Sequence, residues 1–278
     1  MKNLTQRMDT LDQRIQRFNE NDYRPLASET RRSLAQALRT HLTYASNAIE
    51  GNRLTLAETQ VVLNGITVGG KLLRDHLEAI DHADAWDAVV DWSQSADPLT
   101  PHLLRSLHAL GLRHSQPSHA GQYRTVPVAI AGSHLLPPAP IAVPGAVDDL
   151  FTERSAMMAH PVIVGAQMHA ALMKIHPFID GNGRTGRLWL NLWLMRHHYP
   201  PALLSPNDRS QYYAALQSAD VGRGQPMVHV ITHGIERTLQ VYEQVLRMPS
   251  ELPASKPRRS QESSSIRTPS SIDERRSS

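Results

Sequence analysis

The chain has 278 residues, of which 40% are hydrophobic, and this length is enough to bury a full globular core. Its 29 Lys and Arg nearly balance its 26 Asp and Glu, which gives a formal net charge of +3. The absence of cysteine excludes a disulfide framework, a zinc ribbon and a thiol nucleophile. No segment reaches the roughly 18 apolar residues of a membrane span, and residues 1–10 lack a signal-peptide core.

The first predicted helix covers residues 34–49 and has an acid at its end. It is indicated by apolar residues at helical spacing, with Gly51 suited to the position just after a helix. Glu50 then lies in the last turn, where the helix dipole disfavours a negative charge by about 0.3–1 kcal/mol. Glu50 therefore gains from an external cation, although a solvated surface acid is the plainer interpretation of this residue alone. The apolar positions are Leu34, Leu38, Leu42, Ala45 and Ile49.

Three more helices are predicted between residues 55 and 111. A capping box of Thr55 and Glu58 opens the first of them. Apolar spacing indicates the other two, and Thr100 before a proline is a start signal for the last. The apolar positions of these two helices are Leu73, Leu77, Ile80, Leu103, Leu107 and Leu110.

Residues 126–130 give the only convincing β signal in the chain. They read Val-Pro-Val-Ala-Ile, and prolines at positions 137, 138 and 140 would end any ladder of strand hydrogen bonds. Helical patterns resume with residues 164–175 and return, after the prolines at positions 200 and 201, in a last helix that ends near Leu246. The sequence therefore predicts an all-α protein with one short β element.

Residues 176–187, which read His-Pro-Phe-Ile-Asp-Gly-Asn-Gly-Arg-Thr-Gly-Arg, join two predicted helices. Gly181 and Gly183 allow consecutive N–H groups to converge on an anion at the N-terminus of the apolar helix that follows. Arg184 and Arg187 share a helical face and offer planar forks to phosphoryl oxygens. The segment therefore has the groups that a triphosphate needs.

Two more residues of this segment complete a phosphoryl-transfer site. Asp180 is an oxygen ligand suited to Mg²⁺, which takes one or two carboxylates and leaves its other positions to water and phosphate. His176 is left as the general base, since an unperturbed imidazole titrates near ~6.5. A lone His before Pro is more often structural, and a lone Gly-Asn-Gly is usually a turn. The uninterrupted combination is what favours a chemical role.

The other histidines and the C-terminal residues give weaker signals. His169 lies seven residues before His176 on the same helical face, where it either supports the site or packs in the core. Residues 249–278 include ten Ser, few apolar residues and +2 of the net charge, so they cannot bury enough surface to offset ordering entropy. We expect a disordered tail there, as a solvated linker rather than a contact for nucleic acid or an acidic partner.

The segment 176–187 resembles the signature of the Fic family, His-x-Phe-x-Asp/Glu-Gly-Asn-Gly-Arg-x-x-Arg, at every fixed position. The resemblance extends over residues 30–246 and implies an all-α Fic/Fido helical domain with a small β-hairpin flap. It also implies a protein adenylyltransferase, which transfers AMP from ATP to a Ser, Thr or Tyr hydroxyl of a target protein and releases pyrophosphate. We expect residues 1–99 to form an N-terminal helical region, 100–248 the catalytic core and 249–278 the tail.

Carried over by position, the resemblance assigns roles within the site. It makes His176 the base that deprotonates the target hydroxyl, Asp180 the Mg²⁺ ligand and Phe178 the anchor of the loop. It makes residues 128–132 the flap, which binds a target segment by strand addition. The residues implied to bind ATP are Asp180, Gly181, Asn182, Gly183, Arg184, Thr185, Gly186, Arg187, Tyr212, Tyr213 and Asp220, and those of the flap are Val128, Ala129, Ile130, Ala131 and Gly132.

A second segment resembles the inhibitory pattern of the family, Ser/Thr-x-x-x-Glu-Gly/Asn. Residues 46–52 fit this pattern, as in the class whose inhibitory helix precedes the catalytic region. The resemblance pairs Glu50 with Arg187, where the glutamate takes the place of the γ-phosphate of ATP and keeps the enzyme in an off state. Some relatives with this arrangement use the glutamate to remove AMP again, so a reverse activity is a second expectation.

Other functions stay open at the level of the sequence. Doc kinases have Lys where this chain has Gly183, which argues against a kinase. The alternatives are a Fic-fold protein that transfers UMP, phosphate or phosphocholine, and a non-catalytic ATP-binding interaction protein. Asp220 departs from the Asn of animal relatives, and Tyr212 and Tyr213 fit core packing as well as adenosine binding. The expected partners are a target protein, the chain itself as a substrate and a second copy in a homodimer. We expect the protein in the cytoplasm of a bacterium, and we expect it to bind neither a membrane nor nucleic acid.

Overall fold

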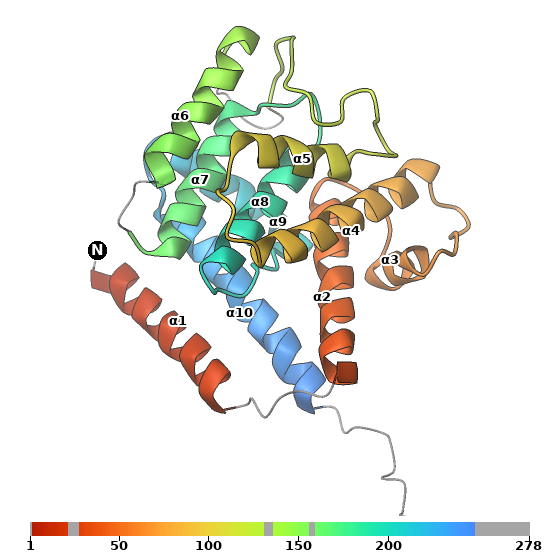
Figure 1. Cartoon of the computed structure of the whole chain (residues 1–278), viewed down its shortest axis with the longest axis vertical. Coiled ribbons are helices and arrows are strands. Elements are labelled where there is room, and N and C mark those ends of the chain that lie inside the picture. The colour runs from red at the N-terminus through yellow and green to blue at the C-terminus, as the bar shows by residue number, and fades with distance from the viewer. Residues whose placement is uncertain (1, 22–27, 131–135, 156–158, 248–278) are drawn as a thin grey trace, which may run out of the picture. The chain divides into compact units, whose positions relative to one another are not determined.

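The computed structural model describes residues 2–21, 28–130, 136–155 and 159–247, and every regular element in these ranges is a helix (Figure 1). The expectation of a helical protein is confirmed. The tail predicted for residues 249–278 lies outside the described residues. Among the described helices, none is both long and apolar enough to cross a lipid bilayer.

Two helices joined by the glycine-rich segment form the centre of the fold. α7 (Pro161–Ile175) and α8 (Asn182–Arg196) pack so closely that a Cβ on Gly165 would lie 2.8 Å from the Trp193 ring. α8 is buried on nearly every face from its start through Leu194. From Leu188 onward its side chains are almost all apolar, as expected for a helix that is buried on every side. Packing on all sides therefore fixes α8, and with it the segment that precedes it.

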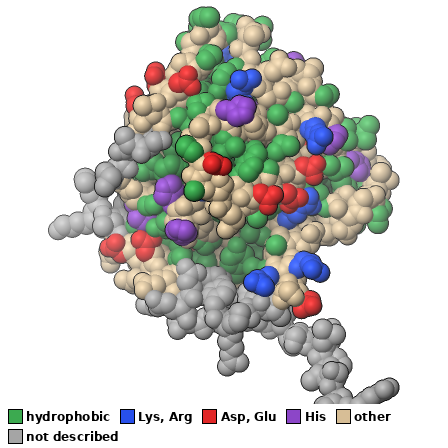
Figure 2. Space-filling model, in the orientation of Figure 1, with side chains coloured by type: hydrophobic (Ala, Val, Ile, Leu, Met, Phe, Trp, Pro, Cys, Tyr) green, Lys and Arg blue, Asp and Glu red, His purple; other side chains and the backbone are tan. Residues whose placement is uncertain are grey.

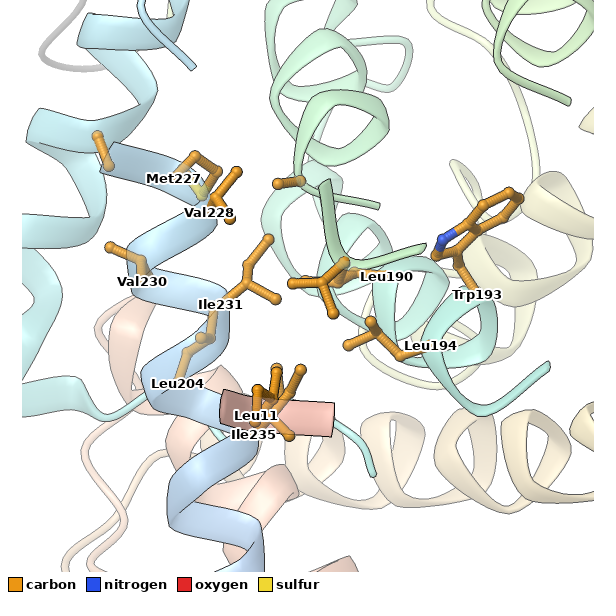
Figure 3. Packing of buried hydrophobic residues seen from close by; sticks show 14 of the residues in the cluster. Leu11, Leu190, Trp193, Leu194, Leu204, Met227, Val228, Val230, Ile231 and Ile235 are labelled. Atoms are coloured by element: carbon orange, nitrogen blue, oxygen red, sulfur yellow. The ribbon is translucent and has the colours of Figure 1, made fainter. Parts of the chain in front are cut away.

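α10 (Gln225–Arg247) covers one side of this pair of helices. Figure 3 shows Ile231 of α10 directed toward Leu190 of α8, in a cluster that also includes α1 (Lys2–Asn21). α9 (Arg209–Asp220) packs between α7 and α10. Because each buried Leu or Ile side chain contributes about 1.5–3 kcal/mol, this cluster fixes the C-terminal helices relative to α8.

Four helices that precede α7 cover the opposite side of α8. α2 (Ser28–Ile49), α4 (Leu73–Ser93), α5 (Pro101–Gly111) and α6 (Val143–Ser155) contribute to a second cluster around Trp189. α2, α4 and α5 each contact α8 directly. The end of α2 and the face of α4 are thereby brought to the N-terminal part of α8.

The smaller elements complete the connections. α3 (Leu56–Leu63) begins with the predicted capping box, in which Thr55 Oγ1 accepts from the Glu58 N–H and the Glu58 carboxylate accepts from the Thr55 N–H. η1 (Pro140–Ala142) and η2 (Pro206–Asp208) are short 3₁₀ turns. The capping box was predicted from the sequence alone, and it is confirmed.

Helices α1 and α6 are absent from the sequence prediction. Each has a short apolar stripe at helical spacing. In α1 the neighbouring residues are strongly polar, and the stripe is buried because α10 covers it. The stripes are Met8, Leu11 and Ile15 in α1, and Val143, Val147 and Leu150 in α6.

The predicted β-hairpin flap is wrong for the residues that the structure describes. Residues 126–130 form an irregular segment without a strand, and residues 131–132 lie outside the described residues. The carbonyls of Val126 and Pro138 accept hydrogen bonds from the guanidinium of Arg124, at 3.3 and 2.6 Å. These carbonyls are directed at the guanidinium rather than at a neighbouring strand, and a proline within the segment has no N–H to donate. An isolated two-stranded hairpin is also only marginally stable.

Figure 2 shows a face of the molecule on which charge types are mixed. Basic and acidic side chains of the described residues lie beside one another there, with hydrophobic side chains between them. Opposite charges at short separation weaken each other's field. This face of the described residues therefore has no broad region of a single sign.

Candidate active site

His176 follows the last turn of α7 in a left-handed conformation, with φ at 50°. Its N–H donates to the Leu172 carbonyl at 3.0 Å and closes the helix. For a residue with a side chain this conformation costs about 1–2 kcal/mol. Such strain persists where the surrounding structure determines the backbone. The turn leads the chain out of α7 and leaves the His176 side chain in the wall of a cavity.

The imidazole of His176 has the form of a proton acceptor. Its Nδ1 lies 3.2 Å from the Met173 carbonyl, and since a carbonyl only accepts, Nδ1 carries the hydrogen and Nε2 the lone pair. Burial lowers the pKa of His176, and the charge of Arg124 lowers it further. The Met173 carbonyl and the carboxylates of Glu50 and Asp180 act on this pKa in the opposite direction without cancelling the shift. The ring is therefore neutral at pH 7.

The loop between α7 and α8 is closed by its own side chains. Asn182 Oδ1 accepts from the Phe178 N–H and Asn182 Nδ2 donates to the Phe178 carbonyl, both at 2.9 Å. The buried Phe178 ring stacks on His108 of α5, with 3.7 Å between the ring centres. His108 accepts from the Gly121 N–H at Nδ1, so its Nε2 donates to the Asp180 carbonyl at 2.9 Å. The Asn182 side chain thus serves loop closure, and Phe178 anchors the loop.

The glycine turn lies at the N-terminus of α8. Gly181 precedes the helix with φ at 75°, and the Thr185 N–H donates back to the Gly181 carbonyl at 2.9 Å. The N–H groups of the first helical residues, which include Gly183, have no partner within the helix and form the positive end of its dipole. A Cβ on Gly183 would overlap Glu50 Oε1. The carboxylate of Glu50 therefore lies against this anion-binding turn.

Arg187 binds the end of α2. Its Nη2 lies 2.8 Å from Glu50 Oε1 and 2.8 Å from the Ser46 carbonyl, and its Nε donates to Ser46 Oγ at 3.0 Å. Burial alone would lower the pKa of Arg187, but the charge of Glu50 raises it. Because the Arg187 side chain is buried, solvent screens this ion pair less than a surface pair. Glu50 thus contacts both Arg187 and the start of α8.

Arg184 has different partners from Arg187. Its buried guanidinium lies 3.4 Å from Glu78 Oε1 and 3.8 Å from Asp180 Oδ1. Glu78, on α4, also accepts from Arg74 Nε at 2.7 Å and from Asn52 Nδ2 at 3.0 Å. Asn52 belongs to the turn that follows α2, so Glu78 links that turn to α8.

Asp180 is the candidate metal ligand. Its Oδ1 accepts from the Gly181 N–H at 2.6 Å, and its Oδ2 accepts from Gln116 Nε2 and from Arg74 Nη2. Burial would raise the pKa of Asp180, but the Gln116 hydrogen bond and the charge of Arg184 lower it. An ionised carboxylate that is 41% exposed beside an anion-binding turn fits Mg²⁺. Among the described residues no three acids or histidines gather to hold a metal, so phosphate oxygens would have to complete its shell.

A cavity of about 230 Å³ lies beside His176. Glu50 and Gly183 line it near the start of α8, and Tyr213 and Asp220 line it from α9. A mainly apolar cavity with a few converging polar groups is the usual form of a small-molecule site. The lining residues are Glu50, Ala129, Ile130, Met173, Lys174, His176, Gly183, Tyr212, Tyr213, Leu216, Gln217 and Asp220.

The paired tyrosines have different surroundings. Tyr212 is buried, its hydroxyl lies 2.8 Å from His169 Nε2, and burial raises its pKa to about 12. His169 Nδ1 lies 3.1 Å from the Gly186 carbonyl, so Nδ1 donates there and Nε2 accepts from Tyr212. Tyr213 is half-buried, with the Arg209 guanidinium 5.0 Å from its ring centre. Tyr212 thus packs against α7 and α8 through His169, and Tyr213 is the more accessible of the two rings.

Several residues of the predicted ATP set do not line the cavity. Thr185 is buried, and a Cβ on Gly186 would overlap Met173. Asp180, Gly181, Asn182, Arg184 and Arg187 are close to the turn but do not line the cavity.

Four residues outside the predicted set hold the arrangement together, and all of them lie far from residues 176–187 in the sequence. Burial lowers the pKa of His108 to about 4, so this ring stays neutral between Phe178 and Asp180. Its position beside Leu104 and Leu107 on the apolar face of α5 is the one signal in the sequence. The four residues are Glu78, His108, Gln116 and Arg124.

Comparison with known proteins gives one consistent match. Residues 98–194 match the model of the Fic/DOC family. The chain is 34% identical over 217 residues to "Protein adenylyltransferase Fic" of Nematostella vectensis and 36% identical over 235 residues to that of Drosophila willistoni. These alignments cover 76% and 83% of this chain but 50% and 46% of the relatives, so the chain spans about half the length of the curated relatives it matches.

Solved structures of Fic proteins share the fold. Fic-1 of C. elegans has a TM-score of 0.76 at 29% identity, over 87% of this chain and 71% of that one. A Fic domain containing signaling protein from Bacteroides thetaiotaomicron has a TM-score of 0.73 at 25% identity, over 88% of this chain and 97% of that one.

Proposed function

Because the chain belongs to the Fic/DOC family, we propose that it is a protein adenylyltransferase, which transfers AMP from ATP to a Ser, Thr or Tyr hydroxyl of a target protein. One observation carries the proposal. The neutral His176, with its lone pair at Nε2, lies in the wall of a cavity that also reaches the anion-binding turn at Gly183. A base and a phosphate site that share one cavity are what hydroxyl attack on a nucleotide requires.

In the proposed reaction, the target hydroxyl oxygen attacks the α-phosphorus of ATP while His176 Nε2 accepts the hydroxyl proton, a step that typically contributes about 10²- to 10⁴-fold. The bond from the α-phosphorus to the oxygen that bridges to the β-phosphate breaks, and pyrophosphate leaves with the electron pair. The N–H groups at the start of α8, Arg184 and Arg187 stabilise the phosphate charge. Asp180 would hold Mg²⁺, which supplies further positive charge to the phosphate oxygens when bound.

We propose also that Glu50 keeps the enzyme in an off state. This assignment is supported by the two contacts of the Glu50 carboxylate, with Arg187 and with the turn at Gly183. Both are groups that the phosphates of ATP would need. ATP bound beside Glu50 would lack the contact of its γ-phosphate with Arg187, and its α-phosphorus would not lie in line with the attacking hydroxyl.

The substrate in this proposal is a protein hydroxyl. Ala129 and Ile130 line the cavity beside His176 and would lie against the target chain. Modification of the chain itself, formation of a homodimer and a cytoplasmic location are proposed on the family pattern.

Incorporation of label from α-³²P-ATP into protein, with Mg²⁺ and cell lysate as a source of targets, tests the proposal. The wild-type chain is compared with Glu50→Gly and with Glu50→Gly/His176→Ala. We expect label only in the Glu50→Gly single variant. Equal label in the wild type would remove the inhibitory role of Glu50. No label in any variant would contradict adenylyl transfer, and binding of UTP, GTP or CDP-choline would then identify another donor.

A further inference from the structure

Arg124 is a buried arginine whose described partners are main-chain carbonyls. Its Nε donates to the His176 carbonyl at 2.8 Å and its Nη2 to the Ile175 carbonyl at 3.4 Å, at the end of α7. Its Nη1 donates to the Val126 carbonyl at 3.3 Å, and its Nη2 also donates to the Pro138 carbonyl at 2.6 Å. One guanidinium therefore joins the end of α7 to the irregular segment that borders the cavity.

A cation in this position is costly, because a charge that leaves water must be compensated inside the protein. Arg124 is only 2% exposed, and burial lowers its pKa. The end of α7 supplies the compensation, since the carbonyls of a last helical turn lack helical partners and form the negative end of the dipole. A neutral side chain would fill the same space at lower cost, so the guanidinium is best explained by the geometry that it fixes.

The backbone that Arg124 holds is the strained backbone of the proposed base. His176 has φ at 50°, and its carbonyl accepts the 2.8 Å bond from Arg124. The main-chain N–H of Arg124 also donates to the Pro177 carbonyl at 2.9 Å. The carbonyls of three consecutive residues are thus bound by one residue. The segment on the other side of the guanidinium contributes Ile130 to the cavity wall.

We propose that Arg124 is a positioning residue, which holds His176 and the segment 126–130 in the relative geometry that brings the base and the target hydroxyl together. The inference rests on the proposed adenylyl transfer. Lysine cannot take this role, because an ammonium is a compact point charge, whereas a guanidinium has five N–H donors in a rigid fork. Misplacement of reacting groups by about 1 Å can lower a rate by about 10²-fold.

The first test measures kcat of AMP transfer, per ATP-binding site, in the Glu50→Gly background. Arg105→Lys is the control, because Arg105 also donates to a main-chain carbonyl, that of Gly121 at 2.8 Å, but is an exposed residue whose bond is to a carbonyl outside α7. We expect Arg124→Lys to lower kcat by roughly 10- to 100-fold with ATP affinity within about threefold. The control should keep kcat within about threefold. Equal kcat in the two variants would overturn the proposal.

A second measurement separates positioning from support of the fold. The charged groups that face His176 are Arg124, Asp180 and Glu50, and Glu50 is absent from the background variant. Arg124→Met removes a positive charge beside His176, whereas Arg124→Lys keeps one. The pKa of His176, followed by NMR of its ring protons, should therefore rise in Arg124→Met and stay unchanged in Arg124→Lys, while kcat falls in both.

The melting temperature and the ATP affinity of the two variants also test the positioning role of Arg124. A lower melting temperature in both variants, with no difference in the pKa of His176, would show a purely structural role and overturn the proposal. Loss of ATP binding in both variants would do the same. The NMR measurement needs no activity. If the Glu50→Gly variant transfers no AMP, adenylyl transfer is contradicted. The difference in the pKa of His176 between Arg124→Met and Arg124→Lys would still test whether Arg124 acts on His176.

Discussion

The two segments that meet at His176 are held in different ways. Residues 176–187 fix much of their own shape, because Asn182, the first residue of α8, bonds to Phe178 in the loop that precedes the helix. Residues 126–130 are held instead by the guanidinium of Arg124, which donates both to the Val126 carbonyl and to the His176 carbonyl at the end of α7. A segment whose decisive contacts lie within itself can be predicted from its own sequence. A segment whose backbone is held by a side chain outside it takes a conformation that its own sequence pattern does not predict.

The largest effect is expected at the residue where the two segments meet. In the Glu50→Gly background, His176→Ala should lower AMP transfer by about 10²- to 10⁴-fold, because the general base is lost. ATP affinity should stay within about threefold, since the phosphate contacts come from α8. Label incorporation and isothermal titration calorimetry measure the two quantities. Loss of the helical circular dichroism signal in this variant would show that His176 is structural.

The second prediction concerns the hydrogen bonds within residues 176–187. Asn182→Ala removes both bonds to Phe178, so it should lower the free energy of unfolding by about 1–3 kcal/mol and transfer by about tenfold or more. Asn191 is the matched control, because it is also buried on α8 and accepts from the Ala202 N–H at 2.8 Å. Asn191→Ala should cost similar stability in urea denaturation but leave transfer per folded molecule unchanged. Equal transfer by the two variants would mean that loop closure has no part in catalysis.

A smaller effect concerns pH. A base with a pKa of about 6.5 is roughly one quarter unprotonated at pH 6.0. Burial lowers the pKa of His176, so activity should be lost at a lower pH than this, and removal of Glu50 shifts the loss further down. We therefore expect the Glu50→Gly variant to keep more than about one quarter of its pH 7.5 rate at pH 6.0, the fraction that an ordinary imidazole would leave. A kcat profile that falls already around pH 6.5 to 7 would contradict the buried, neutral state of this ring.

The smallest effect is expected in the segment that is held from outside. Val126 is 50% exposed, and its bond to Arg124 uses its carbonyl. Val126→Thr leaves that carbonyl in place, so the free energy of unfolding should change by less than about 0.5 kcal/mol and transfer by less than about twofold. Thermal unfolding and the transfer assay measure both. A large loss in either would show that the side chain, and not the carbonyl, fixes this segment.

Most of the helices were predictable because their signals are local. The capping box at Thr55, the start signal at Thr100 and the apolar run of α8 all appear in the structure where the sequence indicates them. α1 and α6 were missed because their apolar stripes are short. The stripe of α1 is covered by α10, which lies far away in the sequence, whereas α6 packs mainly against α7, the next helix along the chain. The β element was wrong for a different reason, since the guanidinium of the nearby Arg124 binds the carbonyls of Val126 and Pro138.

The candidate site could be proposed from the sequence only where its chemical groups are contiguous. Residues 176–187 contain a base, an acid, a glycine turn and two arginines in one run. Local physics predicted that Glu50 needs a cation, but the family resemblance was needed to name Arg187. Nothing in the pattern shows that Glu78 and Arg124 approach this run, because tertiary packing alone brings them there.

Because Glu50 belongs to the same chain as Arg187, its competition with a phosphate group is an intramolecular event. A group on a short flexible tether acts at an effective concentration of about the millimolar range. Glu50 is held more firmly than that, since it follows α2 directly and the next turn is bonded to Glu78 through Asn52. Under the proposed function, a rise in ATP alone would displace Glu50 poorly. Release of Glu50 would therefore depend on movement of the end of α2 more than on the concentration of ATP.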